Sequence, residues 1–115
     1  MSRYVCCLCA MLLAACGSGA PPPAPAAAGP VAPSDPKLAK LYAQTCKACH
    51  TSPTSGAPQA GDAKAWQPRV AQGMRTLLDH AVNGYKGMPP LGTCMDCGEA
   101  EFEALVRFMA GMEAT

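Results

Sequence analysis

The chain has 115 residues and a formal net charge of +1, and it contains 8 cysteines, 12 prolines and 11 glycines. This length corresponds to one small domain, and the composition excludes a multidomain enzyme, a polytopic membrane protein, a coiled coil and a collagen. The charge gives no support for a nucleic-acid-binding protein, which carries a basic patch or stripe. Because so small a chain builds little core of its own, we expect a domain stabilised by a disulfide, a metal or a cofactor.

Residues 1–15 are predicted to be a lipoprotein-type signal peptide. A short, weakly basic start precedes an apolar run over Val5–Leu13, which is shorter than the about 20 residues of a membrane-spanning helix. The run ends in Leu-Ala-Ala-Cys at residues 13–16, which resembles the bacterial lipobox. Cys16 is therefore the predicted lipidation site and first mature residue. Ordinary cleavage nearby, with Cys16 unmodified, is the alternative.

Residues 16–36 are predicted to form a Pro- and Ala-rich tether. Seven of the 12 prolines lie in this segment, and proline at such density favours an extended polyproline II conformation. At about 3.1 Å per residue, the segment would reach roughly 60 Å. We therefore expect the globular domain, residues 37–115, to lie on the periplasmic side of a bacterial membrane, inner or outer. A lipid on Cys16 would anchor it, and the tether would hold it away from the membrane surface.

The globular domain is predicted to be all-α, because no segment alternates polar and apolar residues as a strand does. Capping signals and apolar periodicity predict four helices, over residues 36–46, 63–71, 74–83 and 99–112. Asp35 followed by Pro36 marks the start of the first helix, and Asn83 followed by Gly84 marks the end of the third.

The motif Cys46-Lys47-Ala48-Cys49-His50 has the spacing that attaches c-type haem. Two thiols three positions apart near a helix end can reach the two vinyl groups on one porphyrin edge, and the next residue then presents an imidazole to the iron. Cys46 and Cys49 are therefore predicted to hold one covalent haem c, and His50 to be an axial iron ligand.

Two other readings of these cysteines remain open. Cys46 and Cys49 together with Cys94 and Cys97 would suit a tetrahedral zinc ion, as in a structural zinc lipoprotein. However, 44 residues separate the two pairs, more than the about 15 to 20 of compact zinc motifs. Alternatively, Cys46 and Cys49 form a redox disulfide of the thioredoxin kind, although that motif accompanies strands, which this sequence does not predict.

Met88 is the predicted second axial ligand. It lies in a loop, residues 85–90, that two prolines stiffen and glycines border, so its thioether has little conformational freedom to lose on binding iron. His80 shares a polar helix face and is predicted to be solvated. Of the other methionines after the tether, Met74, Met109 and Met112 are predicted to lie in the core or on the surface, and Met95 lies inside a tight loop between two cysteines.

These motifs and their surroundings resemble the cytochrome c5 family of small class I cytochromes c. The similar stretches cover most of residues 38–112, namely residues 46–50, 56–58, 61–62, 65–73, 83–90 and 94–97. The resemblance implies the class I cytochrome c fold, with about four short helices around one covalently bound haem. It also implies a disulfide between Cys94 and Cys97, and a hydrogen bond from the second imidazole nitrogen of His50 to the Pro58 carbonyl, which would orient the ring.

Axial positions filled by His50 and Met88 leave no open site on the iron, so we expect electron transfer between respiratory redox proteins rather than an enzyme with a small-molecule substrate. The alternative is a haem-based gas sensor or peroxidase in which Met88 is labile. Residues 35–86 carry seven basic and three acidic side chains, against one and five after them. Lys47 and Lys86 are therefore predicted to dock acidic partner surfaces near the haem edge.

Overall fold

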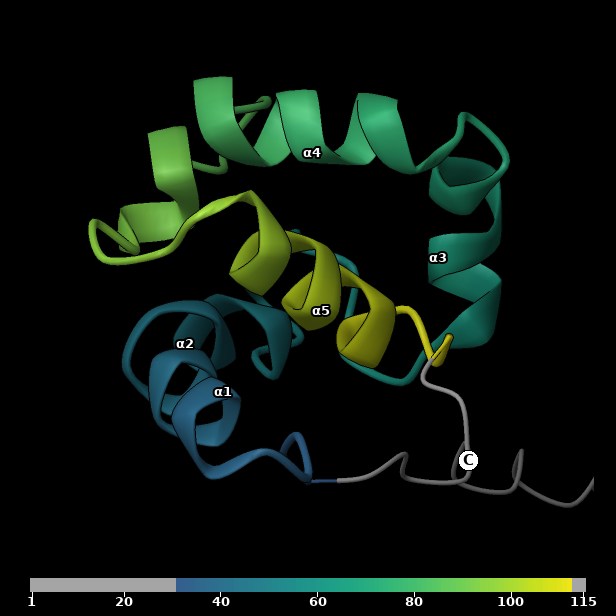
Figure 1. The fold of residues 1–115 in the computed structure, drawn as a ribbon. Helices are drawn as coiled ribbons and strands as arrows, with labels where there is room; N and C mark the ends of the chain where they lie inside the picture. The colour runs from purple at the N-terminus through teal and green to yellow at the C-terminus, as the bar shows by residue number, and fades with distance from the viewer. Residues whose placement is uncertain (1–30, 113–115) are drawn as a thin grey trace, which may run out of the picture.

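The computed structural model describes residues 31–112, so the predicted signal peptide and most of the predicted tether lie outside the described residues. The elements in chain order are α1 (Pro36–Leu41), the π-helical turn η1 (Tyr42–Cys46), α2 (Lys47–His50), α3 (Ala63–Val70), α4 (Met74–Asn83), the 3₁₀ turn η2 (Pro90–Thr93) and α5 (Glu99–Met109). Within residues 31–112 there is no β-strand, only an isolated bridge between Tyr85 and Met88. The predicted all-α fold is confirmed (Figure 1).

The first helical segment runs without a break from Pro36 to His50 through α1, η1 and α2. Its start is as predicted, because the Asp35 carboxylate accepts a hydrogen bond from the Leu38 N–H at 2.8 Å. The predicted end at Cys46 is wrong. No glycine or proline follows to break the helix before His50, and the π-helical turn continues directly into α2. The whole Cys-x-x-Cys-His motif therefore lies in helical conformation.

The helices α3 and α4 lie in the middle of the described chain and end within one residue of their predicted bounds. The Asp62 carboxylate caps α3 by accepting a hydrogen bond from the Ala65 N–H at 3.1 Å. Gly73 (φ 89°) separates the two helices, and Gly84 (φ 85°) ends α4. Both glycines adopt backbone conformations that other residues rarely take, so these boundaries could be read from the sequence.

The helix α5 begins after Gly98, whose backbone N–H donates a hydrogen bond to the Glu101 carboxylate at 3.0 Å. This contact from the first turn stabilises a start that lacks a side-chain cap. The helix ends at Met109 and not at Met112, which corrects the prediction. Gly111 adopts φ 69°, and the Met112 N–H donates back to a carbonyl of the last turn at 2.7 Å.

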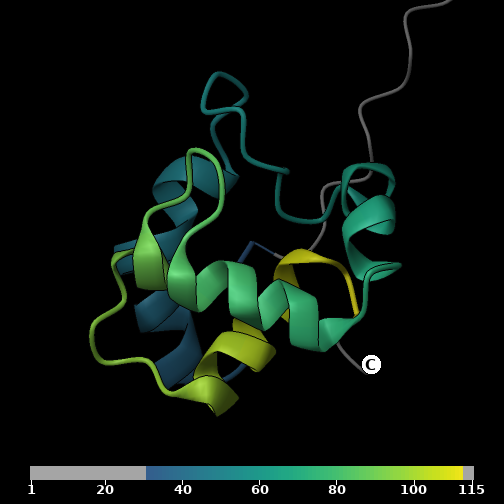
Figure 2. The same cartoon turned by 90° about the horizontal axis from the view of Figure 1, so that it is seen from above.

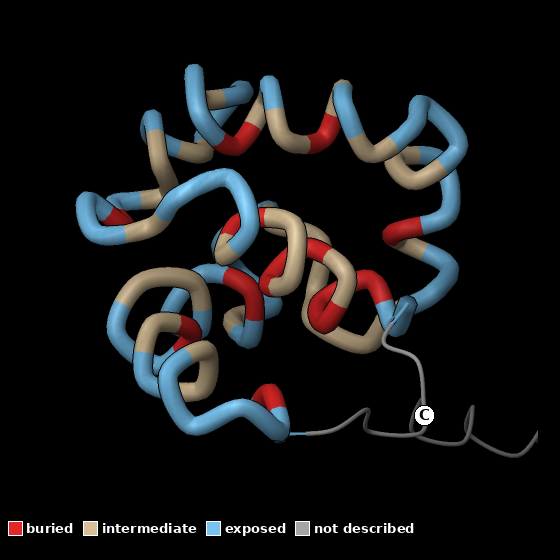
Figure 3. The backbone as a smooth tube through the Cα atoms, viewed as in Figure 1, coloured by how far each residue is buried: buried red, intermediate tan, exposed pale blue. Residues whose placement is uncertain are grey.

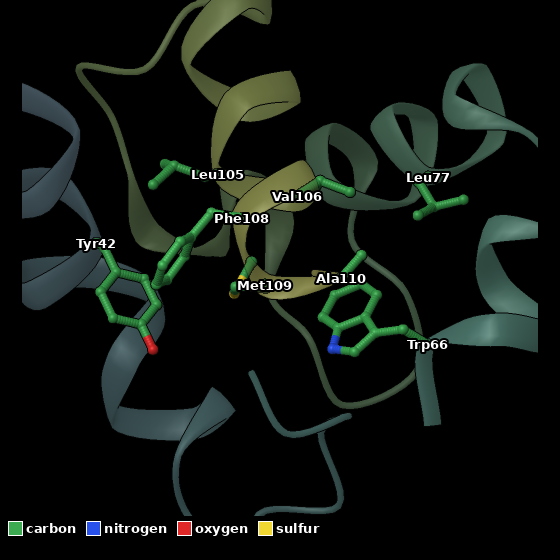
Figure 4. Packing of buried hydrophobic residues seen from close by; sticks show 8 residues of the cluster. All are labelled: Tyr42, Trp66, Leu77, Leu105, Val106, Phe108, Met109 and Ala110. Carbon is green, nitrogen blue, oxygen red and sulfur yellow. The ribbon is translucent and has the colours of Figure 1, made fainter. Parts of the chain in front are cut away.

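Figure 3 shows several buried positions along α5. The buried hydrophobic residues form two clusters. The larger cluster, shown in Figure 4, comprises Tyr42, Trp66, Leu77, Leu105, Val106, Phe108, Met109 and Ala110. In it the Tyr42 and Phe108 rings meet edge to face, with their centroids 4.9 Å apart. The smaller cluster comprises Ala81, Cys94 and Phe102. α5 therefore contributes to both clusters and joins the N-terminal segment to α4.

Figure 2 shows the long connection between α2 and α3, residues 51–62, on the opposite side of α4 from the start of α5. The turn η2 follows the predicted Met88 ligand loop and contacts η1, which ends in Cys46. The fold thus brings the segment after Met88 next to the segment that begins the attachment motif. None of the helices among residues 31–112 combines the length and apolar character that crossing a membrane requires.

Candidate functional site

The two thiols of the attachment motif lie one turn apart on the first helical segment. Cys46 is partly buried at the end of η1, Cys49 is exposed in α2, and both are free thiols. Burial raises the pKa of the Cys46 thiol, and its hydrogen bond with the Thr45 hydroxyl, with 3.3 Å between Oγ1 and Sγ, opposes this effect. Side chains three positions apart are neighbours on a helix, so the pair is presented on one side of it.

The imidazole of His50 is 7% exposed and is oriented by a backbone carbonyl. Its Nδ1 lies 2.8 Å from the Pro58 carbonyl oxygen, and since a carbonyl only accepts, Nδ1 carries the proton and Nε2 keeps its lone pair. Burial is the main cause that lowers the pKa of His50, and the nearby Arg69 charge acts in the same direction. The side chain is therefore set up as a neutral imidazole ligand with Nε2 available.

The connection over residues 51–62 is fixed around His50 by its own contacts. The Trp66 ring stacks on the imidazole with 5.8 Å between centroids, and its Nε1–H donates to the Gln59 carbonyl at 2.9 Å. The Ala60 N–H donates to the His50 carbonyl at 2.7 Å. Neither Trp66 nor Gln59 was predicted as a site residue, although an isolated tryptophan in a chain with few aromatics was a signal available in the sequence.

Met88 closes a tight backbone hairpin. Its N–H donates to the Tyr85 carbonyl at 2.9 Å, and the Tyr85 N–H donates to the Met88 carbonyl at 3.0 Å. Of the two residues between them, Lys86 has φ 53°, a left-handed conformation that is costly for a side chain with a Cβ. The hairpin presents Met88 at the end of a short, strained turn.

The Met88 side chain is partly buried and packs against the cluster of Ala81, Cys94 and Phe102. Gly92 leaves room for this side chain, and Gly84 leaves room for the Met88 backbone. A Cβ on Gly92 would lie 2.9 Å from the Met88 methyl carbon, and a Cβ on Gly84 would lie 3.1 Å from the Met88 carbonyl oxygen. Any larger residue at position 92 would therefore force the Met88 methyl group to shift.

The turn η2 after Met88 was not predicted, because two of its residues that are not glycine adopt left-handed conformations. Leu91 has φ 59° and Thr93 has φ 66°, on either side of Gly92 with φ 51°. Such a run is opposed by local preference and is maintained by tertiary packing. Leu91 packs against the same small cluster as Met88.

The other methionines in the described residues lie in the large cluster or are exposed. Met109 is buried in the large cluster and Met74 packs against it, as predicted, whereas Met95 and Met112 are 79% and 37% exposed. His80 is only partly exposed, and its ring stacks on Tyr85 with 3.9 Å between centroids and 15° between planes. The sequence indicated a solvated histidine and did not predict this contact.

Cys94 and Cys97 are bonded to each other as a disulfide in the structure. The four-cysteine zinc site is therefore not formed, and no group of three or more histidine, cysteine, aspartate or glutamate side chains gathers for a metal ion within residues 31–112. Lys47 and Lys86 are both exposed, and the Lys86 ammonium lies 5.2 Å from the centroid of the Tyr85 ring.

These residues fit a covalently attached haem. The free thiols of Cys46 and Cys49 offer two attachment points one helical turn apart, and His50 keeps Nε2 free of its carbonyl hydrogen bond. Gly92 leaves the space that the Met88 methyl fills. Histidine and methionine are the side chains that hold haem iron in cytochromes c.

Comparison with known proteins identifies the family. Residues 33–109 match the family model described as cytochrome c oxidase, cbb3-type, subunit III. The chain is 38% identical over 74 residues to cytochrome c5 of Ectopseudomonas mendocina, covering 63% of this chain and 85% of that protein. It is 39% identical to cytochrome c5 of Azotobacter vinelandii, covering 63% and 89%. It is 40% identical to cytochrome c-555 of Chlorobaculum tepidum, covering 61% and 68%.

A solved structure of an electron transfer complex of nitrite reductase with cytochrome c contains a similar chain, with a TM-score of 0.59 and 40% identity, covering 68% of this chain and 95% of that one. Proteins of this family bind haem c covalently through the cysteine pair of the shared motif, which here is Cys46 and Cys49. The chain therefore belongs to the cytochrome c5-like family of small c-type cytochromes, which carry electrons.

Proposed function

We propose that this cytochrome is a membrane-tethered, periplasmic single-electron carrier whose haem iron is held by His50 and Met88. The observation that carries the proposal is the state of His50, a buried imidazole whose Nδ1 donates to Pro58 and whose Nε2 remains for iron. A haem with two protein ligands has no open position for a substrate, so the protein passes electrons between other redox centres and is not an enzyme.

The competing function, a gas sensor or peroxidase, requires Met88 to leave the iron. The packing of Met88 against the small cluster and the space left for it by Gly92 favour a ligand that stays bound. Met88 therefore decides between the two functions, and its binding is open to a direct test.

The test is the absorption spectrum of the reduced, purified protein with and without carbon monoxide. We expect a low-spin c-type spectrum that the gas does not change within minutes of mixing. Met88→Ala opens one axial position, so its spectrum should shift with the gas, whereas Met95→Ala, which truncates a 79% exposed methionine, should behave like the unsubstituted protein. A gas-induced shift in the unsubstituted protein within minutes would favour the sensor or peroxidase.

Redox proteins, in particular members of a respiratory chain, are the proposed partners. The similar solved structure is an electron transfer complex of nitrite reductase with cytochrome c, which supports a protein partner. Lys47 lies inside the attachment motif and Lys86 lies in the Met88 hairpin, and both are exposed. We propose that these two lysines steer acidic surfaces toward the haem edge.

An anionic inorganic oxidant, ferricyanide, tests this steering without a known partner. Its reaction with the reduced protein should slow as ionic strength rises, because salt screens the attraction between opposite charges. Lys47→Gln and Lys86→Gln should flatten this salt dependence. Lys40→Gln removes the same charge from an exposed position on α1 and serves as the matched control. Equal salt dependence in all three variants would count against the two lysines.

The proposed anchor is a lipid on Cys16, followed by the Pro- and Ala-rich tether. The sequence Leu-Ala-Ala-Cys at residues 13–16 supports it. Cells fed radiolabelled palmitate should incorporate label into the protein and hold it in the membrane fraction. Cys16→Ser should abolish both results, whereas Cys9→Ser, within the apolar run of the signal, should change neither. Label that persists in Cys16→Ser would overturn the lipid anchor.

A further inference from the structure

The stacked rings of His80 and Tyr85 connect α4 to the Met88 hairpin. Their centroids lie 3.9 Å apart with 15° between the ring planes. His80 lies in the last turn of α4, and Tyr85 is the first residue of the hairpin that Met88 closes. A close, nearly parallel ring contact of this kind is favourable beyond the area it buries.

The partner on α4 is fixed in place. Leu77 and Ala81, on either side of His80 in the helix, are both buried. The last turn is further held by a hydrogen bond from the Asn83 side-chain amide to the Asp79 carboxylate at 2.8 Å. His80 therefore offers the hairpin a rigid surface.

The partner in the hairpin is bonded directly to Met88. Tyr85 and Met88 exchange both backbone hydrogen bonds, at 2.9 and 3.0 Å. Lys86, with φ 53°, makes the turn between them unfavourable for the chain alone. A contact that keeps Tyr85 against α4 thus opposes the opening of the turn, and with it any movement of the Met88 backbone.

The stack does not serve the core. The Tyr85 side chain is 42% exposed and neither ring belongs to a buried cluster. Removing either ring therefore leaves the two clusters intact. Its effect should fall on the hairpin rather than on the fold as a whole.

We propose that His80 and Tyr85 are positioning residues that keep the Met88 hairpin closed and so control how readily Met88 leaves the iron. This inference rests on the proposed binding of Met88 to haem iron. When the two rings are stacked, the hairpin stays closed and the protein is an electron carrier. When the stack is lost, the axial site becomes more accessible.

The test compares His80→Ala, Tyr85→Ala, the double variant and Tyr85→Phe in the haem-loaded protein. Two rates are measured: carbon monoxide binding to the reduced protein, and hydrogen exchange of the Met88 amide, which donates to the Tyr85 carbonyl. Each alanine variant should raise both rates about threefold to tenfold, the factor that corresponds to one stacked aromatic pair. The double variant should resemble the single ones, and Tyr85→Phe, which keeps the ring, should behave like the unsubstituted protein.

Val82→Ala is the matched control, because Val82 is 41% exposed in the same last part of α4 and does not belong to the stack. Haem content and thermal unfolding report whether each variant folds. Unchanged rates in folded alanine variants would overturn the proposal. If amide exchange becomes faster but gas binding does not, the stack holds the hairpin closed without controlling how readily Met88 leaves the iron, and that part of the proposal is overturned.

Failure of the proposed coordination gives a different result. The unsubstituted protein would then bind carbon monoxide as completely and as fast as Met88→Ala. That outcome overturns the control over iron binding, and the amide exchange rates still decide whether the stack holds the hairpin closed.

Discussion

The segments around His50 and Met88 differ in how they are attached to the rest of the molecule. His50 is buried beneath a stacked tryptophan and hydrogen bonded to the connection that follows it. Met88 is carried by a short hairpin that includes Lys86 in a left-handed conformation and ends next to the left-handed η2 turn. The core thus holds one of the two proposed axial ligands, whereas local contacts that are individually weaker hold the other. The Met88 hairpin should therefore respond first to perturbation.

The largest expected effect comes from truncating Trp66, which packs on His50. Trp66 is 5% exposed, and Trp66→Ala should lower the free energy of unfolding by about 3–5 kcal/mol, the usual cost of truncating a buried tryptophan. Denaturant unfolding of the haem-loaded protein measures this change. Trp66→Phe keeps an aromatic ring but loses the bond to Gln59, and should cost about 1–2 kcal/mol. If Trp66→Ala lowers the free energy of unfolding by less than about 1 kcal/mol, the core does not hold the segment around His50.

Two glycines compare the two sides directly. Gly92 and Gly56 have φ 51° and 76°, so an alanine at either position should cost about 1–2 kcal/mol of backbone strain. A Cβ meets the Met88 methyl carbon at 2.9 Å in Gly92→Ala but meets no atom within 4 Å in Gly56→Ala. Both variants should therefore unfold more easily, while only Gly92→Ala should bind carbon monoxide faster than the unsubstituted protein when reduced. Faster gas binding by both variants would contradict the difference between the segments around His50 and Met88.

Relief of the backbone strain at Lys86 should stabilise the Met88 hairpin. Lys86→Gly removes the Cβ at φ 53° and should stabilise the protein by about 0.5–1 kcal/mol, after the greater freedom of glycine in the unfolded chain is taken into account. Thermal unfolding and the rate of carbon monoxide binding check this expectation, and the rate should fall. Lys86→Gln loses the same charge without relieving the strain. If it stabilises the protein equally, charge and not backbone conformation is the cause.

The smallest expected effect concerns an ion pair that lies in neither the segment around His50 nor the Met88 hairpin. The Lys37 ammonium lies 2.7 Å from the Glu101 carboxylate, and this hydrogen bond is the main cause that lowers the pKa of Glu101. Stability from this pair is therefore present above the unfolded pKa of Glu101 and is lost as the pH falls through its folded value. Lys37→Gln should make the acid decrease in melting temperature slightly shallower, whereas Lys40→Gln should not. Because the pair is exposed, the change should be small.

The local parts of this site were predictable from the sequence. The spacing of Cys46, Cys49 and His50 predicts the attachment chemistry, because it reports a fixed geometry between neighbouring residues. Helix starts at Asp35 and Asp62 were equally visible, since their carboxylates bond to the next turn of the same helix.

Features that depend on distant parts of the fold were not predictable. The first helical segment continues through the motif to His50, and the left-handed residues of η2 contradict local preference. The stacking of Trp66 on His50 and of Tyr85 on His80 depends on how two elements meet in space. The need for glycine at position 92 follows from the Met88 methyl group, which no pattern of neighbouring residues reveals.

The proposed binding of Met88 to the iron opposite His50 is tested most directly by proton NMR of the reduced protein. A methionine bound to low-spin haem iron lies over the porphyrin, whose ring current moves its methyl signal far upfield. We expect one such methyl signal, which is lost in Met88→Ala and retained in Met95→Ala. The absence of an upfield methyl signal from the unsubstituted protein, or a signal that survives in Met88→Ala, would contradict the binding of Met88 to the iron.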